Sequence, residues 1–308
     1  MKQDHGSAQA SLASRHEGMT MAASPVTAEE LRIVARDGRS LAATIYSTAA
    51  DGDHVVIVNG ATGVKRSYYD RYARFLASHG LVVLTYDYRG IGGSAEDDIR
   101  AEACDMRQWG EVDVASMIDA AAQRYPGKRL LAVAHSAGGQ LFGLADNKEL
   151  VHAMFALSVQ SGYWKLWSGL PRWCLALLWH VLMPGLVAAL AYFPSRRIGF
   201  GEDLPGGVAR EWARWCRHPE YLVDREGHSL RQQFASYRGR IRACVVSDDW
   251  MAPRAAVEAL MGFFVAAQVE ITSLAPADVG ARALGHFGYF REAGRPAWQE
   301  SLAWLQQQ

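Results

Sequence analysis

The sequence predicts an α/β fold: a doubly wound, mostly parallel eight-stranded sheet with an inserted helical cap. Eight short runs are either continuously apolar or alternating, which is typical of strands. From the third run on, most of them alternate with helical patterns of about ten residues or more, and this alternation favours parallel strands joined by helices. A long Trp-rich insertion separates the sixth run from the seventh and predicts the cap.

Each predicted element has a local signal. The run HVVIVN at 54–59 ends at Gly60 and indicates a strand buried on both faces. Residues 67–79 have helical spacing, begin at a serine cap and stop at Gly80. The predicted strands are 31–35, 41–47, 54–59, 81–86, 129–134, 151–159, 241–247 and 269–274, and the predicted helices include 67–79, 106–125, 253–267 and 296–307.

These elements divide the chain into three parts. Residues 1–28 are predicted to be a disordered tail, because they are rich in Ala, Ser, His and Gly and lack the apolar core of a signal peptide. The alternative is translated sequence upstream of a start near Met19 or Met21. Residues 29–160 and 236–308 are predicted to form the core, and residues 161–235 the helical cap.

Charge and cysteine content exclude several functions. The 32 basic residues balance the 32 acidic ones, so no overall field favours nucleic acid as a partner. The 4 cysteines are far apart and form no C-x-x-C pair, which favours a reducing compartment and a cytoplasmic location. We expect no cofactor and no metal, because neither a phosphate-binding glycine loop nor metal-ligand spacing is present.

Ser136 is the candidate nucleophile. The segment Ala134-His135-Ser136-Ala137-Gly138 follows a buried strand and precedes a helix. A serine exposed on such a sharp turn needs very small residues two positions before and after it. The usual signature is G-x-S-x-G, and here Ala134 replaces the first glycine. The neighbouring His135 is expected to point away from the site and to pack in the core.

With four further motifs, the sequence resembles the α/β-hydrolase superfamily in its serine-nucleophile form. These are Asn59-Gly60-Ala61, the D-x-R-G-x-G-x-S turn from Asp87 to Ser94, the acid turn from Asp248 to Pro253, and Gly285-His286-Phe287. The cap also looks like that of a subgroup of predicted, serine aminopeptidase-like hydrolases. The resemblance implies a Ser136–Asp249–His286 triad, an oxyanion hole from the backbone N–H groups of Ala61 and Ala137, and a structural role for the Asp87–Ser94 turn.

The acid has two candidates. Related sequences place the aspartate four residues before the proline of D-x-x-x-P, which selects Asp249, and Asp248 stays the alternative. His286 is the only histidine that follows the last predicted strand in a glycine-flanked loop. His180 and His228 are expected at surface or lid positions.

The cap is the predicted substrate-binding region. It holds six of the 10 tryptophans: Trp164, Trp167, Trp173, Trp179, Trp212 and Trp215. The first four are candidates for an apolar pocket over Ser136, the alternative being that the aromatics form the core of the cap itself. Residues 173–193 are apolar enough to span a bilayer, but a span would separate Ser136 from His286. We therefore expect this segment to cover the site, with peripheral membrane contact as a third alternative.

The predicted function is hydrolysis of a carboxylic ester or thioester, with an apolar acyl group, through an acyl-serine intermediate. The partner would be a small-molecule ester or acyl substrate, and the oligomeric state stays open. Two alternatives remain: an acyltransferase of the homoserine acetyltransferase type, and a non-catalytic binding protein with a hydrolase fold.

Overall fold

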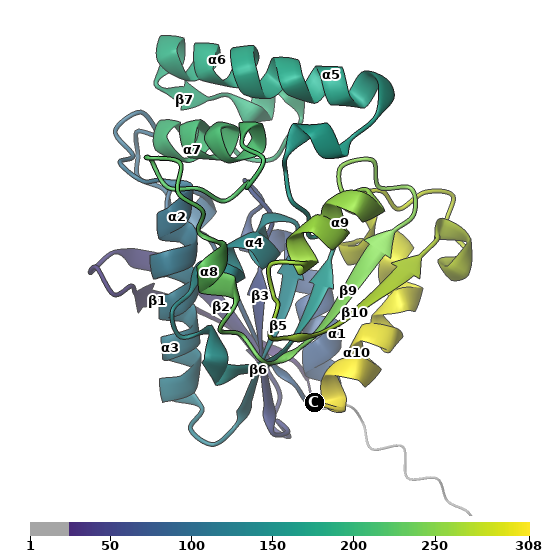
Figure 1. Cartoon of the computed structure of the whole chain (residues 1–308). Helices are drawn as coiled ribbons and strands as arrows, with labels where there is room; N and C mark the ends of the chain where they lie inside the picture. Colours follow the sequence, from purple (N-terminus) through teal and green to yellow (C-terminus); the bar gives the residue numbers. More distant parts are fainter. Residues whose placement is uncertain (1–24) are drawn as a thin grey trace, which may run out of the picture.

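The computed structural model describes residues 25–308, so the greater part of the predicted tail lies outside the described residues. A single eight-stranded sheet forms the centre of the molecule, in the order β1-β2-β4-β3-β5-β6-β9-β10 (Figure 1). The strands are β1 (Thr27–Val34), β2 (Ser40–Ser47), β3 (His54–Asn59), β4 (Val82–Tyr86), β5 (Arg129–His135), β6 (Val151–Leu157), β9 (Arg240–Val246) and β10 (Gln268–Leu274). The β1–β2 and β2–β4 pairs are antiparallel and all others are parallel. The predicted fold class is confirmed.

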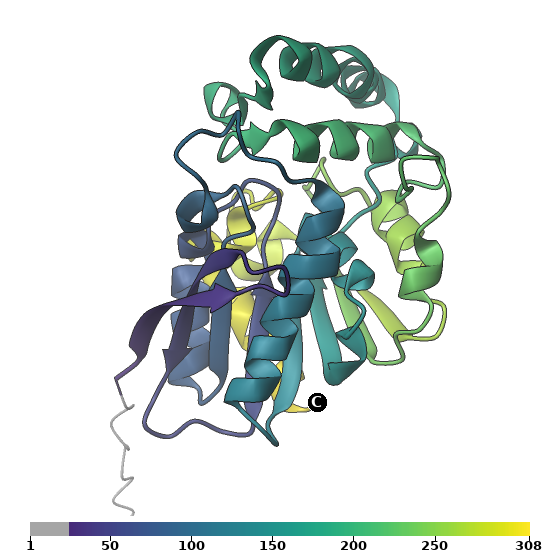
Figure 2. The ribbon, with the colours of Figure 1, turned by 90° about the vertical axis from the view of Figure 1, so that its left-hand side faces the viewer.

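Helices cover both faces of the sheet because side chains of the central strands alternate between two hydrophobic clusters. In β5, Leu130 and Ala132 pack on one face, whereas Leu131 and Val133 pack on the other. The first face is covered by α2 to α4 and α9, and the second by α1 and α10 (Figures 1 and 2). Their bounds are α1 (Asp70–Ser78), α2 (Met106–Gln108), α3 (Ala115–Arg124), α4 (Ala137–Leu144), α9 (Arg254–Met261) and α10 (Trp298–Gln306).

Two element boundaries differ from the sequence prediction. Strand β1 begins at Thr27, inside the segment predicted as tail, because Thr27 pairs with Ser47 across the β1–β2 ladder. The helix predicted over 106–125 contains a π-helical segment, Trp109–Val114, between α2 and α3. At Gly110 in this segment a side chain would meet the Leu141 carbonyl oxygen at 2.7 Å, so the backbone there lies directly against α4.

The insertion between β6 and β9 forms two helical layers above the sheet. The outer layer is α5 (Gly169–Leu177), a π-helical segment (Leu178–Leu182) and α6 (Met183–Leu190). Strands β7 (Tyr192–Phe193) and β8 (Leu204–Pro205) then lead to α7 (Gly206–Arg217), which lies between the outer layer and the sheet (Figures 1 and 2).

The last part of the segment predicted as cap packs on the core. Helix α8 (Arg231–Phe234) lies against α4, where a side chain at Gly143 would clash with the Phe234 ring at 2.0 Å. The covering layer itself is therefore built by α5, α6 and α7.

One helix among residues 25–308 is long and apolar enough to cross a membrane, judged by length and composition alone. It is the 22-residue run Gly169–Leu190 of the outer layer. In the fold, its Trp179, Met183 and Val187 are buried against the rest of the protein.

Candidate active site

Ser136 lies at the sharp turn between β5 and α4. Its backbone angles are φ 53° and ψ −116°, a conformation that is costly for a residue other than glycine. The turn fits because Ala134 is fully buried, and because a side chain at Gly138 would come within 2.1 Å of the Asn59 carbonyl oxygen. Small residues at these two positions are thus required by packing. Ser136 itself keeps 8% of its surface exposed, at the carboxyl edge of the sheet.

The predicted acid and base meet in the structure. His286 Nδ1 lies 2.7 Å from Asp249 Oδ2, and both side chains are buried. The other carboxylate oxygen of Asp249 accepts the Met251 backbone N–H at 2.9 Å. Burial is the largest single influence and raises the pKa of Asp249, but the contacts with His286 and the hydrogen bond from the Met251 N–H together outweigh burial and hold the pKa below its usual range. A proton on Nδ1 leaves Nε2 of His286 as the acceptor for a serine proton.

The neighbouring Asp248 holds the histidine loop by its backbone. Its carboxylate accepts the N–H of Leu284 at 2.9 Å and the N–H of Gly285 at 3.0 Å. Asp248 thus orients the two residues that precede His286, whereas Asp249 contacts the ring. The two candidates for the acid therefore occupy different positions, and the contact with the imidazole belongs to Asp249.

His135 connects the serine turn to the histidine loop. Its Nε2 lies 2.8 Å from the carbonyl oxygen of His286, which can only accept, so Nε2 carries the proton. Its Nδ1 then accepts from the Tyr69 hydroxyl at 2.9 Å. Burial is the main cause that lowers the pKa of His135, to about 3. His135 is buried as expected, but it is also a neutral hydrogen-bonding link.

The predicted oxyanion donor Ala61 is already engaged. Its backbone N–H donates to the Tyr69 hydroxyl oxygen at 2.8 Å, and the same hydroxyl donates to His135. The structure therefore corrects the expectation that Ala61 offers a free donor. Ala137 is the first residue of α4, so its N–H has no acceptor within the helix.

Thr62 was missed by the sequence analysis. Its hydroxyl is buried and makes no hydrogen bond to any residue in the described range. Thr62 also belongs to the lining of the apolar pocket described next. A threonine after Gly-Ala carries no sequence signal that would have distinguished it from its neighbours.

An apolar pocket of about 180 Å³ lies between the cap and the carboxyl edge of the sheet. No Asp, Glu, Lys or Arg lines it. The residues on the side of the sheet are Thr62, Gln160, Gly162, Trp250 and Met251, and those contributed by the cap are Trp167, Cys174, Leu175, Leu178, Trp179, Met183, Phe193, Ser195, Ile198, Phe200, Leu204, Trp212 and Cys216. Met251 connects the pocket lining to the Asp249–His286 pair, because its N–H donates to the Asp249 carboxylate.

The four tryptophans predicted to bind substrate separate into two pairs. Trp167 and Trp179 line the pocket described above. Trp164 and Trp173 do not line it: they pack on each other with ring centroids 6.0 Å apart, and Trp173 is exposed. The expectation for this second pair is corrected, and Trp212 and Trp250 take part in the pocket instead.

Polar atoms in the pocket wall lack partners among residues 25–308. Besides the Thr62 hydroxyl, they are Gln160 Oε1 and Trp179 Nε1, all buried. Unpaired buried polar atoms are costly, and they are commonly satisfied by a ligand or water. Three of the residues that line the pocket therefore carry a buried polar atom without a partner in the described part of the chain.

The turn after β4 braces the loops near the site. Asp87 accepts the N–H groups of Arg66 at 2.6 Å and Gly93 at 2.9 Å. Arg89 forms ion pairs with buried Asp113 at 2.6 Å and with Asp37 at 2.6 Å. These contacts agree with the structural role implied for the Asp87–Ser94 turn.

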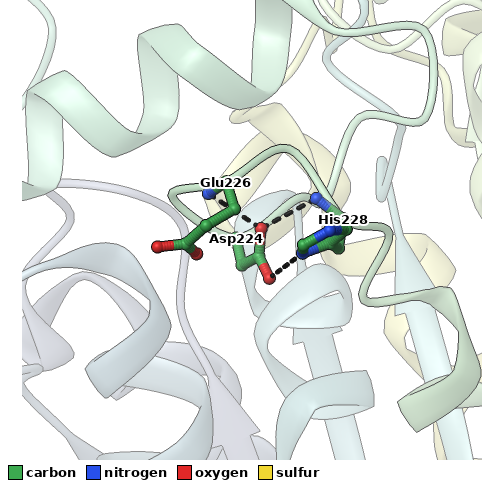
Figure 3. Close-up of side chains that lie close together, drawn as sticks. All are labelled: Asp224, Glu226 and His228. Carbon is green, nitrogen blue, oxygen red and sulfur yellow. Dashed lines mark hydrogen bonds and ion pairs between the residues drawn. The ribbon is translucent and has the colours of Figure 1, made fainter.

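One further group of polar side chains lies in the loop between α7 and α8. The ligand atoms of Asp224, Glu226 and His228 lie within 4.8 Å of one another. Asp224 accepts the N–H groups of Glu226 at 3.0 Å and His228 at 2.7 Å, and also contacts the His228 ring (Figure 3). These hydrogen bonds explain why the three side chains lie close together: they belong to one hydrogen-bonded turn. His228 is exposed, in agreement with its predicted surface position.

Comparisons with known proteins agree with this fold. No curated protein matches the sequence. The structure is similar to an esterase of Pyrococcus furiosus, with a TM-score of 0.58, 14% identity and 91% of each chain covered. It is also similar to DcsB in complex with its substrate analogue, with a TM-score of 0.63, 12% identity, 91% of this chain and 99% of that one. The thioesterase domain from the curacin biosynthetic pathway gives a TM-score of 0.55 at 14% identity, over 91% and 99% of the two chains.

The family assignment comes from the sequence itself. The model of the alpha/beta hydrolase family matches residues 55–298, which include the serine turn, the acid turn, the histidine loop and the whole cap. At sequence identities this low, similarity to the solved structures is evidence for the fold alone. Together with the eight-stranded sheet and the strained serine turn, the match establishes that the chain belongs to the alpha/beta hydrolase family.

Proposed function

We propose that the protein is a serine hydrolase that cleaves a carboxylic ester or thioester with an apolar acyl group. The observation that supports this most is the arrangement at the sheet edge. Ser136 stands on a strained turn, and His135 beside it is bonded to His286, whose ring contacts Asp249. A serine needs such a base within reach to act as a nucleophile at neutral pH.

The chemistry would proceed in two steps. His286 Nε2 takes the proton of the Ser136 hydroxyl as the serine oxygen attacks the substrate carbonyl carbon. The tetrahedral intermediate collapses, the bond to the alcohol or thiol breaks, and His286 returns the proton to the leaving group. A water molecule, deprotonated by His286, then attacks the acyl-serine, and the acid is released with Ser136 regenerated. Asp249 stabilises the imidazolium that forms in both steps.

The negative charge on the intermediate requires hydrogen-bond donors. In our proposal the backbone N–H of Ala137 is one donor. The hydroxyl of Thr62 is the second donor, in place of the backbone N–H of Ala61. Support comes from the different situations of the two groups. The backbone N–H of Ala61 is bonded to the Tyr69 hydroxyl, whereas the Thr62 hydroxyl has no partner among residues 25–308 and belongs to a residue that lines the pocket. Loss of one such donor typically costs about 3–4 kcal/mol of transition-state stabilisation.

The pocket supports an apolar acyl group. A charged substrate would find no counter-ion among its lining residues, whereas Trp167, Trp179 and Trp212 offer broad apolar surfaces. Its volume of about 180 Å³ is below the several hundred Å³ typical of drug-sized ligands. We therefore expect a narrow group, such as a linear acyl chain, in preference to a fused-ring one.

A cytoplasmic location is part of the same proposal. All 4 cysteines are unpaired in the structure, including exposed Cys174, which suits a reducing compartment.

Turnover of p-nitrophenyl esters of increasing acyl length tests this function. We expect hydrolysis that depends on acyl length and disappears in Ser136→Ala. The assay is repeated with an added alcohol or thiol acceptor, because product that appears only with acceptor would identify an acyltransferase instead. Folded protein that binds the esters but turns none over would identify a binding protein.

A further inference from the structure

The outer side of the cap exposes a row of large apolar side chains. Trp173 is 64% exposed, Leu177 51% and Val181 57%, and they follow one another at helical spacing along the run Gly169–Leu190. We call the exposed set the outer cap face; it consists of Leu170, Trp173, Leu177, Val181, Leu182 and Leu186. It lies on α5, the π-helical segment Leu178–Leu182 and α6, which form the layer farthest from the sheet (Figures 1 and 2).

The same helical run is apolar on its inner side. Trp179, Met183 and Val187 recur every four residues and are buried against the protein. A helix that is apolar all round is normally covered on every side, by protein or by lipid. Here protein covers only one side, and scattered exposed residues do not explain a continuous row of this kind.

The charge of the surrounding segment indicates which kind of partner could cover the outer cap face. From Leu150 to Gly201 the sequence contains no Asp and no Glu, although the whole chain has 32 acidic residues. The segment does contain Lys165, Arg172, Arg196 and Arg197. Arg196 pairs with Glu202, whereas the other three make no salt bridge to any described residue.

Tryptophan rings lie beside two of these cations. Lys165 lies over the Trp164 ring at 5.5 Å, and Arg172 lies over Trp164 at 5.2 Å and Trp173 at 5.7 Å. Tryptophan favours the boundary between hydrocarbon and headgroups, and cations near it attract anionic lipid.

We propose that the outer cap face docks on the surface of an anionic lipid bilayer. A second copy of the chain fits this face less well, because a symmetric contact would bring two acid-free, cationic segments together. The buried inner stripe also argues for a helix that lies in the interface, since a spanning helix would have to leave its contacts with α7.

Docking in this orientation would define the substrate class of the proposed hydrolase, and this part rests on the function proposed above. Ile198, Phe200 and Trp250 line the pocket and are also among the exposed large apolar residues. Apolar side chains thus lead from the outside of the cap region into the pocket. We infer that the enzyme acts on an ester dissolved in the bilayer, whose acyl chain enters the pocket from the lipid.

Vesicle flotation with the full-length protein tests the docking. We expect the protein, and equally its Ser136→Ala variant, to float with vesicles of phosphatidylcholine and phosphatidylglycerol in equal parts. Binding should be about tenfold or more weaker with phosphatidylcholine alone. The double variant Leu177→Glu/Val181→Glu should lose most of this binding. The matched control is Val34→Glu/Val265→Glu, because both valines are highly exposed but lie off the cap, and it should bind as the wild type does.

Several results would overturn the proposal. One is failure of the protein to bind either kind of vesicle, and another is an equal loss of vesicle binding in both double variants. A third is resistance of the bound protein to carbonate extraction, which would indicate a spanning helix. Dimerisation in solution that Leu177→Glu/Val181→Glu abolishes would assign the face to a second copy. Turnover of a water-soluble ester without vesicles, measured in the same variants, separates these outcomes from failure of the proposed hydrolase function, because Leu177 and Val181 do not line the pocket.

Discussion

His135 Nε2 donates to the carbonyl oxygen of His286 at 2.8 Å, which ties the residue before the candidate nucleophile to the candidate base. The link continues from His135 Nδ1 through the Tyr69 hydroxyl to the Ala61 N–H. Three loops at the sheet edge are therefore joined by one buried chain of hydrogen bonds. Because buried networks hold their members in one geometry, we infer that this chain positions the site.

The variant Tyr69→Phe tests this positioning role. It removes the hydroxyl that serves both Ala61 and His135, and we expect kcat to fall about tenfold or more and stability to fall by about 1–2 kcal/mol. Tyr72→Phe is the matched control, since Tyr72 is equally buried on α1 but bonds Ser301, away from the site. Its stability should fall similarly while kcat is retained. Equal kcat values in Tyr69→Phe and Tyr72→Phe would show that this hydrogen-bond network does not position the catalytic residues.

Substitutions at Thr62 test the revised oxyanion donor. Thr62→Val keeps the shape of the side chain but removes the hydroxyl, and we expect kcat to fall by about 10²–10³ with little change in melting temperature. Thr62→Ser keeps the hydroxyl and should retain most of the activity. If Thr62→Val is as active as the wild type, the hydroxyl does not hold the oxyanion.

The pair Asp248→Asn and Asp249→Asn separates the two carboxylates. Asp249→Asn should lower kcat by about 10⁴, because an amide cannot hold His286 in the required tautomer. Asp248→Asn should act mainly on thermal stability, because Asp248 accepts backbone N–H groups of Leu284 and Gly285 and does not contact the ring. Steady-state kinetics and thermal melts of both variants give the comparison. An equal loss of kcat would show that the acid assignment is wrong or incomplete.

Glu211 on α7 predicts a pH dependence of stability. Burial, with a contribution from the nearby Asp105 charge, raises the pKa of Glu211 to about 7. The folded protein then binds this proton more tightly than the unfolded chain does. The resulting stabilisation is complete below the unfolded pKa, near 4.5, and is lost as the pH rises through about 7.

Thermal melts of the wild type and Glu211→Gln check this prediction. The glutamine mimics the protonated side chain, so the melting temperature of the variant should rise relative to the wild type between about pH 5 and about pH 8. A difference that stays constant over this range would mean that Glu211 does not titrate there.

The fold was predictable because its central strands carry strong local signals. The runs at 55–58 and 130–134 are continuously apolar, and the structure pairs the strands that contain them in parallel, with Asn59 opposite Ala134. The serine turn was predictable for a related reason. Only small residues fit where Gly138 approaches the Asn59 carbonyl, so the requirement is visible in the sequence.

Other parts of the site carry no comparable signal. In the sequence, a tyrosine of an amphipathic helix that only packs in the core cannot be told from one whose hydroxyl also forms hydrogen bonds. The role of Tyr69 could therefore not be predicted from the sequence. The cap posed a different problem. Because the run Gly169–Leu190 is apolar on all sides, its pattern could not show that Trp179 faces inward and Trp173 outward.

Labelling with a fluorophosphonate, followed by mass spectrometry of the modified peptide, tests the central claim most directly. The probe reacts with a serine only when a base activates it and its hydroxyl is accessible. We predict one adduct, on Ser136, that is absent in Ser136→Ala and strongly reduced in His286→Ala. Folded wild-type protein that takes up no label, or that is labelled equally in Ser136→Ala, would contradict the account.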